Sequence, residues 1–486
     1  MLYDVWIEPW IPVRMSDGSR HEFGLGETLE KAQEILEIDE PLPALQFGLY
    51  RLLLAMVMDV YRFGEGENSL EDFLEEGLWD ARAFSAYYDD NRQRFDLFDP
   101  EWPFLQTKVP QDHDKKPSSV ASLLQHIPSG TGAIHFCHAL QDEHAWAPKV
   151  CARALTAIAP FMTSGGAGYS PSINGAPPWY VLLKGPTLAE TLLFNCWAEP
   201  KQAPYIGLGV PSWRRSSRVQ PKEEQSHYRL LEAYTWQPRI VQLLPSEGGR
   251  CTYTGKQSQT LVREMHFTFG LKTANPDNWL DPQVAYLETR VGRKKVMPRK
   301  GEAPWRNFSA LVLEEKRPGV VGQFKEFLED ELELERINLE CYGMRTDNMK
   351  IFEWSKEGLT FDSGLLEHER AKEEVQEALL KIEDYHNLMM RCLKEAFQEK
   401  RAQAGRLLYD KLRQPFLTEF LVKLNETHEN DPLTALQTWW VEQVRKTTTH
   451  VFESEVSKLG VRGDAMTRAA SARKIYYGRL RKWRGD

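Results

Sequence analysis

The change in hydrophobic pattern near residue 362 most constrains the fold of this chain. Beyond this point apolar residues recur every three or four positions, with charged residues opposite them, as in amphipathic helices. Four such segments follow one another with short connections, and we therefore predict an antiparallel four-helix bundle over residues 363–486. The four predicted segments are Val375–Leu393, Leu407–Leu424, a helix that starts at Asp431-Pro432 with an N-cap and a first-turn proline, and Ser454–Trp483 with a break near Gly463.

Residues 1–362 mix strand-like runs with helices. Leu42–Tyr61 is apolar on nearly every face, which predicts a helix buried in a globular core. The segment is too short, and too closely bounded by charged residues, to span a membrane. The acidic stretch Glu326–Glu340 is typical of a solvated helix. The fold class is therefore α+β, with a mixed domain before the bundle. Short strands are predicted at Asp4–Val13, Trp179–Leu183, Ile240–Leu244, His266–Leu271 and Leu311–Leu313.

The balance of charge limits how the chain can contact nucleic acid. A net charge of −9 argues against a protein that coats nucleic acid over its whole surface, so basic patches must supply any such contact. The strongest patch is Thr289–Arg306, which contains Arg293, Lys294 and Lys295 and has the composition of an exposed loop or hairpin. The alternative is a solvated face that only aids solubility. A second basic run, Arg473–Arg484, lies at the C-terminus.

Targeting and redox signals are absent from the sequence. The N-terminus lacks a basic segment followed by an apolar run, and the six cysteines form no CxxC pair. We therefore expect a cytoplasmic protein without membrane contact, with reduced and mostly buried thiols and without a metal or other cofactor.

The sequence contains no strong catalytic motif. There is no GxSxG elbow, no nucleotide-binding loop of the Walker type and no GxGxxG. His135, His138, Asp142 and His144 carry metal-capable side chains and leave a metal-dependent nuclease or phosphohydrolase as an alternative. Because their spacing does not match an HExxH frame, we favour a histidine-rich loop and do not expect an enzyme.

Two segments suggest contact with DNA through short polar side chains and bare backbone. The first is the glycine run Gly165, Gly166, Ala167 and Gly168 within Ser164–Trp179. The second is Asp347-Asn348 within the stretch Tyr342–Trp354. A plain turn at the first and an Asx turn at the second are the alternatives.

Several segments carry a family resemblance. In chain order they are Trp10–Arg14, Trp102–Lys108, the glycine run, Trp236–Pro238, Ala303–Trp305 and Arg345–Glu353. With the helical C-terminus behind them, the chain resembles from end to end the large-subunit (CasA) family of the type I-E CRISPR Cascade, an RNA-guided DNA surveillance complex.

The resemblance implies a non-catalytic subunit that recognises the protospacer-adjacent motif (PAM) in double-stranded DNA from the minor groove, starts unwinding and helps recruit a helicase-nuclease. It assigns the glycine run to the family's glycine loop, with Ala167 in place of a glycine, and Asp347-Asn348 to a wedge at the tip of a hairpin. It also places Arg263 at or near a lysine finger that precedes a strand, with Lys256 close by. In all three elements the residues here differ in part from the family pattern.

The resemblance implies further contacts with RNA and with partner subunits. A loop over Ser129–Trp146, including Gly130, Gly132, His135, Phe136 and His138, would contact the crRNA and the target. The helical region would dock against the small subunits and the displaced DNA, and the crRNA-bound backbone would be a further partner. Many members carry a zinc knuckle of which only Cys251 remains here, so that region must hold without metal. A scaffold subunit whose glycine loop touches no DNA is a second alternative.

Overall fold

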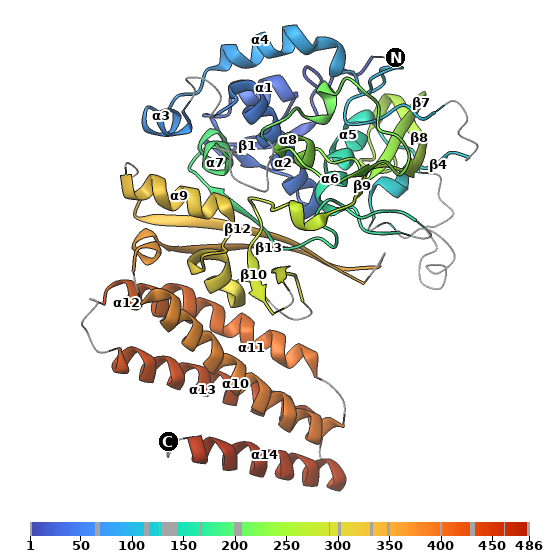
Figure 1. Ribbon diagram of the computed structural model, residues 1–486. Coiled ribbons are helices and arrows are strands. Elements are labelled where there is room, and N and C mark those ends of the chain that lie inside the picture. The colour runs from blue at the N-terminus through green and yellow to red at the C-terminus, as the bar shows by residue number, and fades with distance from the viewer. Residues whose placement is uncertain are drawn as a thin grey trace.

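The computed structural model describes residues 2–63, 69–110, 116–125, 127, 144–165, 168–198, 207–290, 292–299, 303–330, 334–347, 350–368, 370–398, 401–427, 433–460 and 462–483. The helices and strands up to Asp362, here called the mixed part, lie mostly above a set of long helices, the C-terminal part, in Figure 1. A long β-hairpin crosses the molecule between these two parts. The mixed fold class is therefore confirmed.

The strands pair into small sheets. Their orders are β2-β1-β3, β4-β8-β7, β13-β12-β5, β10-β11 and the parallel pair β6-β9. The strands are β1 Ile11–Met15, β2 Arg20–Phe23, β3 Ile35–Ile38, β4 Ser118–Ser119, β5 Tyr180–Lys184, β6 Glu224–Gln225, β7 Arg239–Arg250, β8 Gln257–Phe269, β9 Lys272–Thr273, β10 Tyr286–Thr289, β11 Gly292–Lys295, β12 Arg336–Asp347 and β13 Lys350–Asp362.

Helices surround these sheets and form the C-terminal part. Those of the mixed part are α1 Leu25–Glu30, α2 Pro43–Tyr61, α3 Leu70–Glu75, α4 Ala81–Asn91, α5 Pro148–Thr156, α6 Ile158–Phe161, α7 Leu188–Asn195, α8 Leu230–Tyr234 and α9 Gly319–Asp330. Those of the C-terminal part are α10 Ala371–Phe397, α11 Ala402–Gln414, α12 Leu421–Asn425, α13 Thr434–Val456 and α14 Gly463–Trp483.

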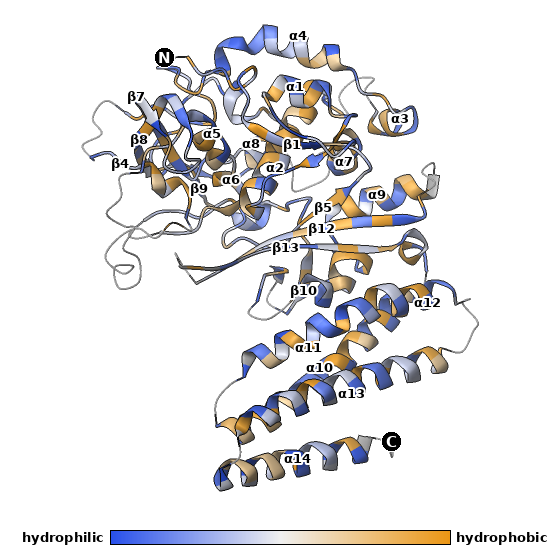
Figure 2. Cartoon of the chain, turned by 180° about the vertical axis from the view of Figure 1, so that it is seen from behind, coloured by the Kyte–Doolittle hydropathy of each residue, from blue (hydrophilic) through white to orange (hydrophobic). Residues whose placement is uncertain are grey.

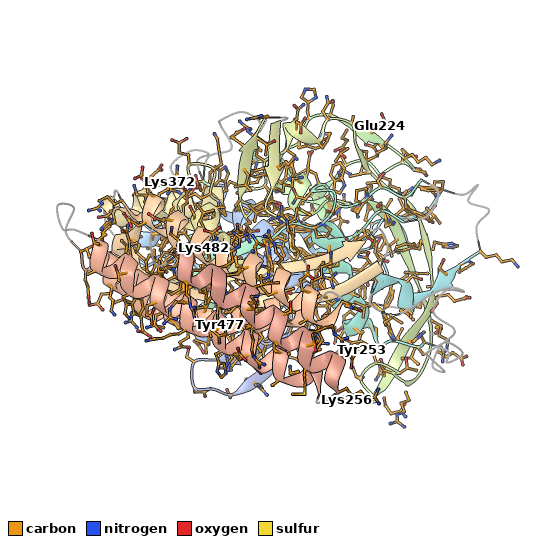
Figure 3. All side chains as sticks on the ribbon, turned by 90° about the horizontal axis from the view of Figure 1, so that it is seen from below. Glu224, Tyr253, Lys256, Lys372, Tyr477 and Lys482 are labelled. Atoms are coloured by element: carbon orange, nitrogen blue, oxygen red, sulfur yellow. The ribbon has the colours of Figure 1, made fainter. Side chains whose placement is uncertain are left out.

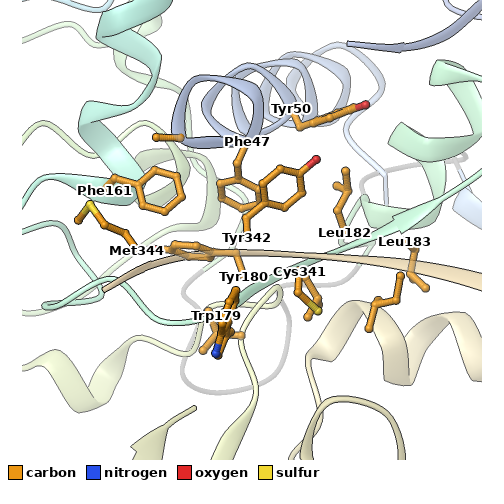
Figure 4. Close-up of a cluster of buried hydrophobic side chains, with 14 of the residues drawn as sticks. Phe47, Tyr50, Phe161, Trp179, Tyr180, Leu182, Leu183, Cys341, Tyr342 and Met344 are labelled. Atoms are coloured by element: carbon orange, nitrogen blue, oxygen red, sulfur yellow. The ribbon is translucent and has the colours of Figure 1, made fainter. Parts of the chain in front are cut away.

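The core is built around α2, whose helical prediction is confirmed. Pro43 occupies the first turn and Arg62 ends the helix in a left-handed conformation. In the described part of the chain, α2 is the one helix long and apolar enough to cross a membrane, but 94% of its most apolar window is buried in the fold. Its aromatic side chains pack against β5 and β12; Phe47 stacks on Tyr180 with ring centroids 4.7 Å apart (Figure 4).

The C-terminal helices alternate polar and apolar faces, as Figure 2 shows. α10 packs against α11, α13 and α14, and Phe452 of α13 stacks on Tyr476 of α14 at 4.1 Å. The region is joined to the mixed part by Trp305, whose ring lies 5.1 Å from that of Phe416. Their arrangement as a simple antiparallel four-helix bundle, and the division into two domains at residue 362, stay predictions.

Several predicted elements are wrong in detail. Leu311–Leu313 lies in a buried π-helical turn over Ser309–Leu313, because a short apolar run does not distinguish a strand from a helical turn. Only the end of Asp4–Val13 is a strand. The predicted helix Glu326–Glu340 ends with α9 at Asp330, and β12 follows from Arg336.

The predicted C-terminal helices also differ in their limits. The second is divided by a π-helical turn at Pro415–Phe420 into α11 and α12. The fourth begins only at Gly463, since α13 continues to Val456. Asp431-Pro432, the predicted start of the third, lies outside the described residues.

Candidate nucleic-acid interface

The glycine loop forms a tight turn directly after α6. The Tyr169 N–H donates a hydrogen bond of 3.3 Å to the Gly165 carbonyl. Gly168 has a φ of +95°, a conformation that side chains disfavour, and a Cβ there would lie 3.4 Å from the Phe269 ring. Gly166 and Ala167 lie outside the described residues. The two described glycines thus form a turn that brings bare backbone to the end of β8.

A stack of aromatic rings packs against this turn. The Tyr169 ring stacks on Phe269 at 4.5 Å, and its hydroxyl donates to the Phe267 carbonyl at 3.4 Å. The Arg239 guanidinium lies 4.6 Å from the Tyr169 ring centroid. It donates to the Thr163 carbonyl at 2.8 Å and to the Ser170 carbonyl. The loop is therefore held on both sides by one guanidinium.

Sequence reasoning missed this supporting group. Arg239 is buried, which lowers its pKa to about 10, so it stays charged at neutral pH. Two signals in the sequence could have indicated it: a tyrosine directly after the glycine run, and aromatic residues two positions apart at Phe267 and Phe269, which share one face of a strand.

Arg263 lies inside β8 and not before it, contrary to the position expected of a finger. Leu244 pairs with Glu264 and Pro245 with Val262, so Arg263 is the extra residue of a β-bulge. Its guanidinium donates to the Ser246 hydroxyl at 2.6 Å and to the Glu247 carbonyl at 3.3 Å.

Lys256 is the residue directly before β8. It is exposed and projects at the edge of the molecule in Figure 3. Lys256 therefore has the position expected of a finger preceding a strand, whereas Arg263 lies seven residues farther along the chain with its side chain bound to β7.

Asp347 is the last residue of β12 in a long hairpin (Figure 1). It pairs with Lys350, so the connection is the dipeptide Asn348-Met349, which lies outside the described residues. Toward the base, β5 pairs with Asn338–Tyr342. The predicted wedge thus belongs to the end of a hairpin whose other end is part of a three-stranded sheet.

The hairpin is packed tightly against the rest of the mixed part. A Cβ on Gly343 would lie 2.5 Å from the Trp179 ring, so only glycine lets this tryptophan lie against the strand. Trp354 meets the ring of Phe161, the last residue of α6, at 5.4 Å. Since the glycine loop follows α6, the hairpin and the loop share a support.

The first part of the basic patch Thr289–Arg306, predicted as an exposed loop or hairpin, lies in the hairpin β10–β11. Arg293 and Lys294 are exposed, and Arg293 pairs with Glu288 at 3.0 Å. Lys295 does not share this surface: its ammonium donates to the Asn174 carbonyl at 2.8 Å, and burial lowers its pKa to about 8. Lys295 turns inward because it pairs across the hairpin with the buried Tyr286, at the end of β11 that is nearest the core.

The region of the histidine-rich loop is only partly described. Gly130, Gly132, His135, Phe136, His138 and Asp142 lie outside the described residues. His144 contacts the ring of Trp146 edge-on at 6.2 Å. In the ranges that the structure does describe, no group of three or more His, Cys, Asp or Glu side chains could hold a metal ion.

Hydrogen bonds hold the turn that contains Cys251. The buried Sγ accepts the Ala147 N–H at 3.3 Å, and the Thr252 N–H donates to the Ala145 carbonyl at 2.8 Å. Trp146 itself pairs with Val262 of β8. These contacts join the turn to the segment before α5. Of the described cysteines, Cys151, Cys196, Cys251, Cys341 and Cys392 are free thiols and buried, which confirms that prediction for them.

Comparison with known proteins identifies the family. A family model described as CRISPR-associated protein Cse1 matches residues 4–451. The chain belongs to the Cse1 family. A CasA/Cse1 protein of Thermus thermophilus is 31% identical to this Cse1-family chain over 437 residues, which are 86% of this chain and 81% of that protein. The resemblance seen in the sequence is therefore confirmed.

Solved structures agree with this assignment. The structure of Thermus thermophilus CasA (Cse1) gives a TM-score of 0.76 at 25% identity, covering 99% of the Cse1-family chain and all of the other. Thermobifida fusca Cse1 gives 0.78 at 20% identity, with 99% and 98% of the two chains covered. A chain of a structure named CRISPR RNA-guided surveillance complex gives 0.74 at 18% identity, with 98% and 99% covered, and shows a shared fold.

Proposed function

We propose that this Cse1-family chain is the large, non-catalytic subunit of an RNA-guided CRISPR surveillance complex, in which it recognises the PAM in double-stranded DNA from the minor groove. In this role it starts unwinding of the duplex and helps recruit the helicase-nuclease. Its partners are the crRNA-bound backbone, the small subunits and the target duplex, in the cytoplasm.

The observation that carries the proposal is the shared support of the glycine loop and the hairpin. Phe161 ends α6 four residues before Gly165, and its ring contacts Trp354 of β13. A minor groove is only about 6 Å wide, so a loop of bare backbone can approach base edges that bulky side chains cannot reach. A hairpin fixed to the same support suits insertion beside that contact.

The chemistry at the tip suits opening a duplex. Asn348 has an amide that can hydrogen-bond minor-groove acceptors or cover the last base pair. Unstacking one base step costs about a few kcal/mol, and pairing between guide and target offsets this cost. No covalent bond is made or broken in this role, so the chain requires no catalytic residues for it.

The test is a reconstituted crRNA complex, with and without this subunit, binding duplexes that carry a randomised PAM at fixed salt. Enrichment of a short set of PAM sequences only in the presence of the subunit supports the proposal. Equal binding with and without the subunit would contradict it and favour a scaffold role.

Single substitutions then locate the contact. Asn348→Ala and Lys256→Ala are expected to weaken PAM-dependent binding while leaving assembly intact. Arg263→Ala tests the other candidate for the finger, whose guanidinium already donates to Ser246 and Glu247 of β7. Asn338→Ala is the matched control, because Asn338 is exposed at the base of the same hairpin and bonded to Thr360 at 2.8 Å. Loss of assembly in any of the first three variants would mean that the substituted residue is structural.

A further inference from the structure

A strained turn lies beside the glycine loop. The Glu223 N–H donates to the Gln220 carbonyl at 3.1 Å, which closes a β-turn with Pro221 and Lys222 at its centre. Lys222 has a φ of +61°. Proline followed by a positive φ is the pattern of a type II turn, whose third position favours glycine or asparagine. A lysine at this position is disfavoured for the turn itself.

The other strained residues have local explanations. In the described part of the chain, four non-glycine residues have a positive φ. Arg62 and Gln398 end the helices α2 and α10, where this conformation is common. Leu105 is partly buried with its side chain packed on the core. Lys222 follows no helix and is exposed, so neither capping nor core packing accounts for it.

The side chain of Lys222 reaches the support of the glycine loop. Its ammonium lies 4.5 Å from the centroid of the Phe269 ring. The same ring stacks on Tyr169 and is the group nearest to the Cα hydrogens of Gly168, where a Cβ would contact it at 3.4 Å. The left-handed backbone therefore places one positive charge next to the loop.

The neighbouring acids have partners of their own. The Glu223 carboxylate accepts the Gln220 N–H at 2.9 Å and the Gln225 amide at 3.3 Å. Glu224 pairs with Lys272 at 2.5 Å. Across the described residues, no hydrogen bond or ion pair joins Lys222 to a carboxylate. Its charge is thus available to an external anion.

We infer that Lys222 binds a backbone phosphate of the target duplex beside the point where the glycine loop enters the minor groove. This inference rests on the proposed function. The turn and the contact with Phe269 place a compact point charge next to bare backbone. An ammonium at such a place positions a duplex without reading its sequence.

The experiment measures binding of the reconstituted complex to one PAM-bearing duplex between 50 and 200 mM salt. Each phosphate contact contributes about 0.9 to the slope of log K against log salt. Lys222→Gly and Lys222→Gln are expected to lower the magnitude of that slope by about 0.9, which is about a 3.5-fold change in relative affinity over this range. PAM preference should stay the same.

Two controls separate this role from folding and from general charge. Lys222→Arg keeps the charge and should keep the slope, and Lys272→Gln removes a nearby lysine already paired with Glu224 and should do the same. Glycine suits the turn better than lysine, so Lys222→Gly should melt at the same or a higher temperature.

The outcomes are distinct. An unchanged slope in both Lys222→Gly and Lys222→Gln, with PAM-dependent binding intact in the unsubstituted complex, would overturn the inference and leave Lys222 a partner of Phe269 only. Absence of PAM-dependent binding in the unsubstituted complex would instead overturn the proposed function, and this inference with it.

Discussion

The ring of Phe161 meets the indole of Trp354 edge-on, with centroids 5.4 Å apart and planes at 82°. Phe161 ends α6, and Trp354 stands on β13 opposite Met344 of β12. The contact links two segments almost 200 residues apart in sequence. A shift of the hairpin therefore acts on the helix that leads into the glycine loop.

Phe161→Leu should uncouple the β12–β13 hairpin from α6 at a modest cost in stability. Leucine keeps most of the buried volume but loses the edge contacts with Trp354 and with Tyr180. We expect the free energy of unfolding to fall by about 1–2 kcal/mol in urea denaturation. Phe63→Leu, in a separate aromatic cluster, is the control. Only Phe161→Leu should also weaken duplex binding, and equal binding by both variants would contradict the coupling.

Gly343→Ala should distort the hairpin. The new Cβ would lie 2.5 Å from Trp179 and 2.9 Å from Pro298, so the ring or the strand must move. This movement should lower the free energy of unfolding by about 1–3 kcal/mol. Gly358→Ala is the matched control on the partner strand, where no atom lies within 4 Å of an added Cβ. Thermal melting measures both. Equal melting temperatures for the two variants would contradict this prediction and show that the Trp179 ring moves aside at no cost in stability.

Asp281→Asn should be strongly destabilising. Arg51 and Asp281 are 3% and 0% exposed at their side chains and are joined by two hydrogen bonds of 2.9 and 2.5 Å. Removal of the carboxylate charge leaves the buried guanidinium without an opposite charge. The free energy of unfolding, measured with denaturant, should therefore fall by about 3–5 kcal/mol. Arg51→Met combined with Asp281→Leu should recover much of this loss. A cost below about 1 kcal/mol for the single variant would contradict full burial of the pair.

Lys295 should impose a pH dependence on stability. Burial lowers its pKa to about 8 in the folded state, against about 10.4 for an unfolded lysine. Between these values the unfolded chain binds more protons, so this group makes unfolding less favourable as pH rises. Relative to Lys295→Met, the free energy of unfolding should rise by about 2 kcal/mol from pH 7.5 to 9.5. Parallel curves for the two proteins would contradict the pKa shift.

The parts of the fold that were predictable from sequence are those with an unbroken periodicity. α2 and the C-terminal helices show long apolar faces, and β5 is a short apolar run beside Trp179. The hairpin was not predicted as strands because its acidic start resembles a solvated helix. The alternation was nonetheless there: Ile337, Leu339 and Cys341 are buried while Asn338 between them is exposed.

The site could be predicted only where composition determines conformation. A glycine run predicts close backbone approach, and the structure places Gly168 in a glycine-favouring turn. Support by Arg239 and Phe269 depends on which strand ends meet after folding, which a pattern local in sequence does not contain. The inward side chain of Lys295 likewise follows from strand register, not from the charge of the patch.

The β12–β13 hairpin is a long arm. β12 and β13 have 12 and 13 residues, so at about 3.3 Å per residue the arm is about 40 Å long. β5 pairs with the base of this arm at Asn338–Tyr342. Farther along, Trp354 packs on Phe161 and Gly343 lies against Trp179. The arm is thus anchored near its base, where the ring of Tyr342 of β12 packs against Phe47 of α2 with centroids 5.3 Å apart. Leverage on the hairpin therefore ends in the aromatic packing of the core, so core substitutions around Phe47 are expected to affect DNA opening without touching DNA.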